Sequence, residues 1–195
     1  ACFLTTSAGR LHATTRLVLQ LAVAHSATLR AAGTILDYGC GSGVLGLAAL
    51  ALSASPTSRC IAVDVHDAAL FSARRNALLN GFGGRFSARW AWEVPAQLDA
   101  DVVLCNMMAG PLLAGVATEL AARARPGGLL LLSGIRESDV AAVRRGLSPH
   151  YELPATATLS VDGRSDEAGG RWLAFACRRA DTAVSVSDLS DGAVA

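Results

Sequence analysis

The sequence predicts an α/β fold: a doubly wound, mostly parallel sheet with helices on both faces. Short apolar runs alternate along the chain with segments whose apolar residues recur at helical spacing. The runs are apolar throughout rather than alternately apolar and polar, which is typical of strands buried on both faces. The chain has 195 residues, of which 52% are hydrophobic and 17% charged, so it is large enough to bury one substantial core.

Each element follows from its local pattern. The spacing of apolar residues predicts helices over 10–33, 44–52, 67–80, 110–128 and 137–147, several of which end at turns such as "NGFGG" and "PGG". Compact apolar runs predict strands at 34–39, 60–65, 85–92, 100–106, 129–134, 152–161 and 171–179. The polar segment "DGRSDEAGG" joins the last two strands as a hairpin, which places one antiparallel strand at the end of the sheet.

Residues 1–180 are therefore predicted to form one domain. Residues 181–195 lack aromatic side chains and helical periodicity, so we interpret them as a flexible C-terminal tail. The chain begins at Ala1 rather than at a methionine, which leaves room for a leader or an upstream domain.

Composition narrows the function classes. A net charge of +1 gives no support for direct nucleic-acid binding, and no apolar run is long enough to span a bilayer. The five cysteines are odd in number and scattered, without a C-x-x-C pair, which argues against a disulfide framework or a metal site. This usage is compatible with a reducing compartment and predicts a cytoplasmic protein, or a mitochondrial or plastid one if a leader precedes it.

The stretch "DYGCGSGVLG" follows the strand at 34–39 and sits where open parallel sheets bind ligands. Two cofactors fit. Gly41, Gly43 and Gly46 match the dinucleotide fingerprint, with Asp64 placed 18 residues later as a ribose-binding acid. S-adenosylmethionine, which has a ribose and an adenine but no phosphate, also needs glycines for close backbone approach.

The pattern D-x-G-x-G-x-G, formed by Asp37, Gly39, Gly41 and Gly43, favours S-adenosylmethionine. A carboxylate at Asp37 suits the cationic methionyl end of that molecule and is poorly placed against a pyrophosphate. Asp64 ends the next strand, where its carboxylate can accept hydrogen bonds from both ribose hydroxyls of either cofactor.

Asn106 ends the strand at 100–106 and places a polar group at the mouth of the crevice. Two readings stay open for it, a binding role and a cap for the following helix. For Trp90 and Trp92 the alternatives are stacking on adenine and filling the core.

From Phe3 to about Arg179 the chain resembles the methyltransferases that modify ribosomal protein L11. The resemblance rests on "HATTRLVLQ", "LDYGCGSGVLGLAAL", "VDVHDAALFSARRNALLNG", "DVVLCNMMAGPL" and "PGGLLLLSGI". It implies a seven-stranded class I methyltransferase domain over 1–180 and cofactor contacts at Thr15, Gly39, Asp64 and Asn106. It also implies methyl transfer to protein amino groups, of lysine side chains or the N-terminal amine, with a ribosomal protein as the partner.

Two departures leave alternatives open. Arg10 occupies the place of the last glycine in the family's loop before Thr15, and the family's substrate-gripping N-terminal domain has no counterpart within these 195 residues. The alternatives are a lysine methyltransferase of another protein, such as the electron-transfer flavoprotein β subunit, a non-catalytic cofactor-binding module, and an NAD-dependent oxidoreductase.

The catalytic residue is predicted to be Asn106. Its side-chain carbonyl is expected to accept hydrogen bonds from the amine and so aim the nitrogen lone pair. An apolar mouth lined by Met107 and Met108 is expected to disfavour the charged ammonium. No side chain stands out as a general base.

Overall fold

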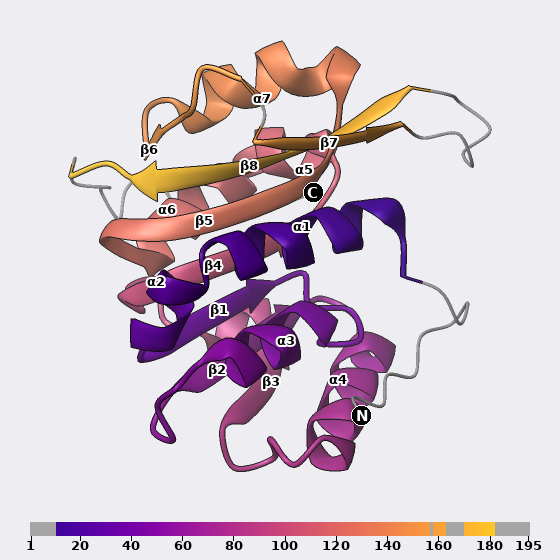
Figure 1. Ribbon diagram of the computed structural model, residues 1–195, viewed down its shortest axis with the longest axis vertical. Coiled ribbons are helices and arrows are strands. Elements are labelled where there is room, and N and C mark those ends of the chain that lie inside the picture. Colours follow the sequence, from indigo (N-terminus) through magenta and orange to yellow (C-terminus); the bar gives the residue numbers. More distant parts are fainter. Residues whose placement is uncertain (1–10, 157, 163–169, 182–195) are drawn as a thin grey trace.

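The computed structural model describes residues 11–156, 158–162 and 170–181 (Figure 1). Its helices are α1 (Ala13–Ala24), α2 (Ser26–Ala31), α3 (Val44–Leu52), α4 (Asp67–Leu79), η1 (Ala91–Glu93), α5 (Ala109–Pro111), η2 (Leu112–Val116), α6 (Ala117–Arg123), η3 (Glu137–Asp139) and α7 (Val140–Leu147). Its strands are β1 (Thr34–Tyr38), β2 (Arg59–Asp64), β3 (Phe86–Trp90), β4 (Ala100–Asn106), β5 (Ala124–Arg136), β6 (Tyr151–Glu152), β7 (Leu159–Asp162) and β8 (Arg171–Arg179). Arg10 and all of the predicted tail except Asp181 lie outside the described residues.

The strands form one open sheet in the order β3-β2-β1-β4-β5-β8-β6, with β7 also paired to β8. Strands β1 to β5 are mutually parallel, and β8 runs antiparallel to β5. β6 and β7 pair with opposite ends of the same edge of β8, so together they fill a single position. The predicted mostly parallel sheet and its antiparallel final strand are confirmed, although β8 lies inside the sheet and not at its edge.

Helices cover both faces of the sheet, as predicted. On one face, α1, α3 and α4 pack against inward residues such as Ile35 and Val102. On the other face, α6 and α7 pack against the next residues along the same strands, Leu36 and Val103. Figure 1 shows α1 and α3 in front of the sheet and α6 behind it. Because successive strand residues point to opposite faces, each apolar run supplies both cores.

Two of the predicted helices are interrupted. The segment 10–33 forms α1 and α2, which are separated at His25, where φ is −101° and ψ is 24°. The segment 110–128 forms α5, a π-helical turn η2 and α6, and it is broken at Gly115, whose φ is +113°. The last part of this segment, from Ala124 onward, already belongs to β5.

Two predicted strands are shorter than expected. β3 ends at Trp90, and the next residues form η1. The segment 152–161 provides β6 and β7 in place of one strand. Pro154 lies between them, and since proline has no N–H to donate, it does not continue a ladder. Its carbonyl instead accepts a hydrogen bond from Arg144 Nη1 at 2.6 Å.

Candidate functional site

The glycine loop between β1 and α3 is held against the end of β2. The backbone N–H groups of Gly39 and Cys40 both donate to the Val63 carbonyl at 2.9 Å, and Gly43 N–H donates to Cys40 O at 2.8 Å. Gly39, Gly41 and Gly43 have φ values of +71°, +53° and +77°, a region that favours glycine. The sequence prediction of a sharply turned loop at this position is confirmed.

The three glycines have different surroundings. A Cβ at Gly43 would stand 2.9 Å from Phe86 Cζ, whereas a Cβ at Gly41 would meet nothing within 4 Å. Gly43 therefore allows α3 to pack against its neighbours, while Gly41 presents bare backbone to open space. This is the arrangement that a closely approaching ligand needs.

Asp64 lies directly beside this loop. Its Oδ2 accepts a hydrogen bond from Gly41 N–H at 2.9 Å, and its Oδ1 accepts from Val65 and His66 N–H at 2.8 and 3.0 Å. The structure thus brings Asp64 and the glycine loop together at the carboxyl ends of β1 and β2. A carboxylate has about four acceptor positions, so capacity for a ligand hydroxyl remains.

Asp37 lies beneath the loop, with 1% of its surface exposed. Its Oδ2 accepts a hydrogen bond from Gly46 N–H at 2.8 Å, whereas its Oδ1 is buried and has no partner among the described residues. Burial, reinforced by the nearby charge of Asp64, raises the pKa of the Asp37 carboxyl to about 7, although the Gly46 hydrogen bond opposes the shift. An unpaired buried carboxylate oxygen is costly to keep charged, which agrees with the direction of this pKa shift.

Asn106 lies at the end of β4. Its Nδ2 donates a hydrogen bond to Thr15 Oγ1 in α1 at 3.1 Å. Its Oδ1 is buried and accepts no hydrogen bond from any described residue. The helix that follows begins at Ala109, and its cap position, Met108, is not bonded by a side chain, so Asn106 does not act as the cap.

A pocket of about 390 Å3 opens beside Asn106. It is lined by His12, Thr14, Asn106, Met107, Met108, Gly134, Arg136 and Trp172. Both methionines line it, as predicted for the mouth of the site, and Met108 is 67% exposed at its rim.

Gly134 explains how this pocket is shaped. A Cβ there would lie 2.6 Å from the Met107 carbonyl oxygen, and its φ is +89°. Met107 N–H donates to Ser133 O at 3.0 Å, so the backbone just after Asn106 rests directly on the end of β5. The absence of a side chain at Gly134 permits this close approach.

Trp90 and Trp92 stack on each other, with ring centroids 4.6 Å apart and planes 17° from parallel. Trp92 is 69% exposed, so it does not fill the core. Trp90 pairs with Asp64 in the β2–β3 register, and its side chain packs partly buried against the hydrophobic core. A contact with adenine stays a prediction.

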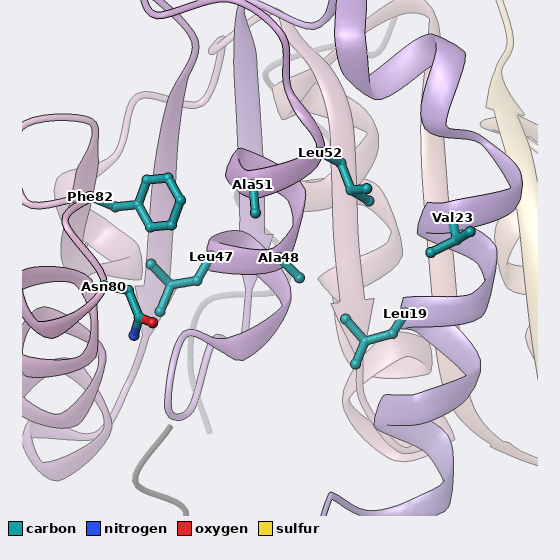
Figure 2. A pocket seen from close by; sticks show the side chains of 8 residues that line it. All are labelled: Leu19, Val23, Leu47, Ala48, Ala51, Leu52, Asn80 and Phe82. Carbon is teal, nitrogen blue, oxygen red and sulfur yellow. The ribbon is translucent and has the colours of Figure 1, made fainter. Parts of the chain in front are cut away.

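A second hollow, of about 460 Å3, lies away from all these residues (Figure 2). It is lined by Leu19, Val23, Leu47, Ala48, Ala51, Leu52, Asn80 and Phe82. Figure 2 shows these side chains on α1, on α3 and after α4, with only Asn80 contributing polar atoms. None of the predicted site residues belongs to it.

Known proteins match the chain over most of its length. A family model described as ribosomal protein L11 methyltransferase (PrmA) matches residues 8–160. The chain belongs to this family. A ribosomal protein L11 methyltransferase from Pseudomonas paraeruginosa is 42% identical over 135 residues, covering 67% of this chain and 44% of that protein. One from Edwardsiella ictaluri is 40% identical over 124 residues, covering 64% of this chain and 41% of that protein. The chain thus spans less than half the length of these relatives.

Solved structures confirm the Rossmann-like methyltransferase fold. A ribosomal protein L11 methylase from Lactobacillus delbrueckii subsp. bulgaricus superposes with a TM-score of 0.68 at 24% identity, covering 87% of this chain and 80% of that one. An O-methyltransferase from Bacillus cereus in complex with SAH gives a TM-score of 0.60 at 14% identity, covering 89% and 84%. At these identities the likeness concerns the fold alone.

Sequence reasoning missed Gly134, Arg136 and Trp172. The signal for Gly134 was its place directly after the strand "LLLLS", which matches the way the glycine loop follows β1. No comparable signal marked Arg136 or Trp172, because only the insertion of β8 beside β5 brings them together: Arg136 pairs with Trp172 in that register.

Among the described residues, no helix is long and apolar enough to cross a membrane.

Proposed function

We propose that this chain transfers the methyl group of S-adenosylmethionine to an amino group of a protein, most simply a ribosomal protein of the L11 type. The observation that carries the proposal is the unpaired Oδ1 of Asn106, a residue that lines the pocket and ends the strand next to β1, which the glycine loop follows. Family membership favours the methyl donor over the dinucleotide that the glycine pattern left open. The relatives' names favour a ribosomal protein over the electron-transfer flavoprotein.

The residues present fit S-adenosylmethionine. Asp64 and the bare backbone at Gly41 would hold the ribose, and the unpaired Asp37 Oδ1 would face the cationic methionyl end. Thr15 would act near Asn106, to which it is hydrogen-bonded. When bound, the cofactor supplies a methyl group on a positively charged sulfur, and the leaving thioether needs no acid.

Asn106 orients the acceptor in this proposal. Its Oδ1 accepts a hydrogen bond from an amine N–H, while the bond from Nδ2 to Thr15 fixes which way the amide faces. The methyl group would pass from the sulfur of the bound cofactor to the nitrogen that Asn106 orients, and water would take the proton from that nitrogen. Alignment is the main contribution, and it supplies a large rate effect when the reacting atoms are held in line.

The pocket also selects the uncharged amine. A free lysine has a pKa of about 10.4, so roughly one in a thousand is uncharged at neutral pH. The apolar walls formed by Met107, Met108 and Trp172 disfavour the ammonium by desolvation.

Cytoplasmic localisation stays a prediction.

The experiment supplies the protein with S-adenosylmethionine labelled in its methyl group and with purified ribosomal protein L11. We expect label on L11, located by mass spectrometry to amino groups, and about 100-fold slower transfer by Asn106→Ala. The absence of label on L11 and on every other protein of a ribosomal fraction, despite measured cofactor binding, contradicts the proposal and supports a non-catalytic binding module.

A further inference from the structure

The pocket beside Asn106 contains a guanidinium, that of Arg136, which forms no ion pair with any residue that the structure describes. Arg136 ends β5, lines the pocket and is half-buried. Among the residues that the structure describes, no carboxylate pairs with its guanidinium and no hydrogen bond reaches it. The neighbouring Glu137 instead forms an ion pair with Arg171 at 3.7 Å. A half-buried guanidinium that lacks an anion is suited to bind one from outside.

An aromatic platform fixes the position of this guanidinium. Its Cζ lies 4.8 Å from the ring centroid of Trp172, which is 7% exposed. The His12 ring meets Trp172 edge-on, with centroids 5.8 Å apart. Stacking occupies a face of the guanidinium but leaves the N–H groups at its edge able to donate. The cation is thus held in place with its donors available.

The arrangement of the strands places Arg136 on the acceptor side. Asp64 and Gly41 belong to the ends of β2 and β1, whereas Arg136 and Trp172 belong to β5 and β8. Asn106, on β4, lies between these two groups in the strand order. A cofactor held at Asp64 that presents its methyl group to Asn106 therefore leaves the Arg136 side of the pocket for the molecule that accepts the methyl group.

We propose that Arg136 determines specificity by binding a carboxylate that lies close to the methylated amine. The accepted substrate is a peptide segment in which an aspartate or glutamate stands within about two residues of the lysine or terminal amine. This proposal rests on the function proposed above. It follows because Arg136 and Asn106 line a single pocket of about 390 Å3, which has room for little more than one or two side chains.

The guanidinium acts in two ways. It forms charge-assisted hydrogen bonds with the carboxylate, and a planar fork can do so through two N–H groups at once. Its positive charge also offsets the charge of that carboxylate, which alone would favour the ammonium form of the neighbouring amine. Both effects depend on charge, whereas a merely structural role for Arg136 would depend only on its stacking against Trp172.

Binding without turnover tests the charge directly. The protein is loaded with S-adenosylhomocysteine, which has no methyl group to transfer, and is titrated calorimetrically with nine-residue peptides carrying one central lysine. In each pair of peptides, a glutamate one or two residues before or after the lysine is replaced by glutamine. We expect at least one glutamate peptide to bind about tenfold more tightly than its glutamine partner, and the difference to shrink at high salt.

Variants assign this preference to Arg136. Arg136→Met keeps a long side chain but removes the charge, and we expect the glutamate-to-glutamine affinity ratio to fall to about one. Arg136→Lys should retain an affinity ratio of about three, because lysine keeps the positive charge but lacks the planar guanidinium. Arg75→Met removes one charge from the exposed side of α4 and should retain the full ratio. If Arg136→Met does not fold, as judged by circular dichroism, Arg136→Gln takes its place.

The two proposals fail in different ways. A wild-type ratio near one at every position, or a ratio that survives Arg136→Met, overturns the role of Arg136 even if both peptides are methylated. A glutamate preference that Arg136→Met abolishes, found with no methyl transfer to any peptide or protein, keeps the carboxylate site and contradicts the proposed function.

Discussion

Asn106 Nδ2 donates a hydrogen bond to Thr15 Oγ1 across 3.1 Å and so joins the end of β4 to the first turn of α1. The bond spans 91 residues of sequence and engages one of the two N–H groups of the amide. The amide oxygen, Oδ1, is buried and accepts no hydrogen bond from any described residue. The orientation of Asn106 therefore depends on Thr15, and this dependence can be measured.

Thr15→Val removes the acceptor and keeps the side-chain shape. We expect turnover to fall about tenfold, because the Asn106 amide loses its fixed orientation, while the affinity for S-adenosylhomocysteine changes less than turnover does. Thr15→Ser keeps the hydroxyl and is the matched control. Steady-state kinetics and calorimetry measure the two effects. An equal loss in both quantities would instead make Thr15 a cofactor ligand only.

Asn106→Ala is expected to lower turnover about 100-fold while the affinity for S-adenosylmethionine stays within tenfold. The reason is that, in the proposed function, Oδ1 orients the acceptor amine, whereas Asp64 and the glycine loop hold the cofactor. Asp64→Ala provides the contrast, because it should weaken binding itself. Similar binding losses in the two variants would contradict this division of roles.

Alanine substitutions at Gly41 and Gly43 should affect ligand binding and protein stability to different extents. A Cβ at Gly41 enters open space, so Gly41→Ala should cost only about 1 kcal/mol in the free energy of unfolding through its positive φ but weaken S-adenosylhomocysteine binding at least tenfold. A Cβ at Gly43 meets Phe86 and Ala73 at 2.9 and 3.2 Å, so Gly43→Ala should lower stability more. Calorimetry and thermal unfolding give both quantities. Wild-type affinity in Gly41→Ala would show that no ligand approaches there.

Gly134→Ala should displace the backbone of Met107, which lines the pocket. Its Cβ would lie 2.6 Å from the Met107 carbonyl oxygen, and neither backbone has room to move freely. We expect a loss of about 3 kcal/mol or more in the free energy of unfolding. Gly127→Ala is the control, since Gly127 has a φ of +68° but nothing within 4 Å of its Cβ position, and should cost about 1 kcal/mol. Equal costs in urea unfolding would rule out the contact with Met107 as the cause.

Asp37 makes stability depend on pH. Its folded-state pKa of about 7 lies above the usual value near 4, so between these pH values the folded protein holds a proton that the unfolded chain has released. The contribution of Asp37 to the free energy of unfolding therefore falls as pH rises from about 4 to about 7 and is level above that. Asp37→Asn lacks this component, so its stability relative to wild type should rise by about 2 kcal/mol from pH 5 to pH 8. Parallel pH profiles of the two proteins in urea unfolding would contradict the raised pKa.

Local patterns predicted the elements that depend on local chemistry. The helix over 44–52 and the strand over 100–106 have the predicted bounds, because an uninterrupted apolar run ends in each case at a clear polar or turn residue. The break at Gly115 was missed, since a glycine within a helical pattern is as compatible with a continuous helix as with a kink. The division of 152–161 into two strands could have been expected from Pro154. Proline has no backbone N–H to donate, and the strand prediction did not take this into account.

The site was predictable where the ends of neighbouring parallel strands supply it. Asp64 and Gly41 meet because parallel strands end at the same edge of the sheet. The hydrogen bond between Thr15 and Asn106 was not worked out from local pattern; the family resemblance only indicated both positions. Arg136 and Trp172 meet through the register of an antiparallel strand, which nothing in either segment encodes.

β8 lies between β5 and the short strands β6 and β7, although it is the last of the described strands along the chain. During synthesis, one edge of β5 therefore stays unpaired until residues 171–179 have left the ribosome. Since Trp172 belongs to that strand, a nascent chain that stops before it can build the glycine loop but not the wall opposite Asn106. In the proposed function, the side of the pocket that receives the acceptor therefore forms after the glycine loop on the cofactor side.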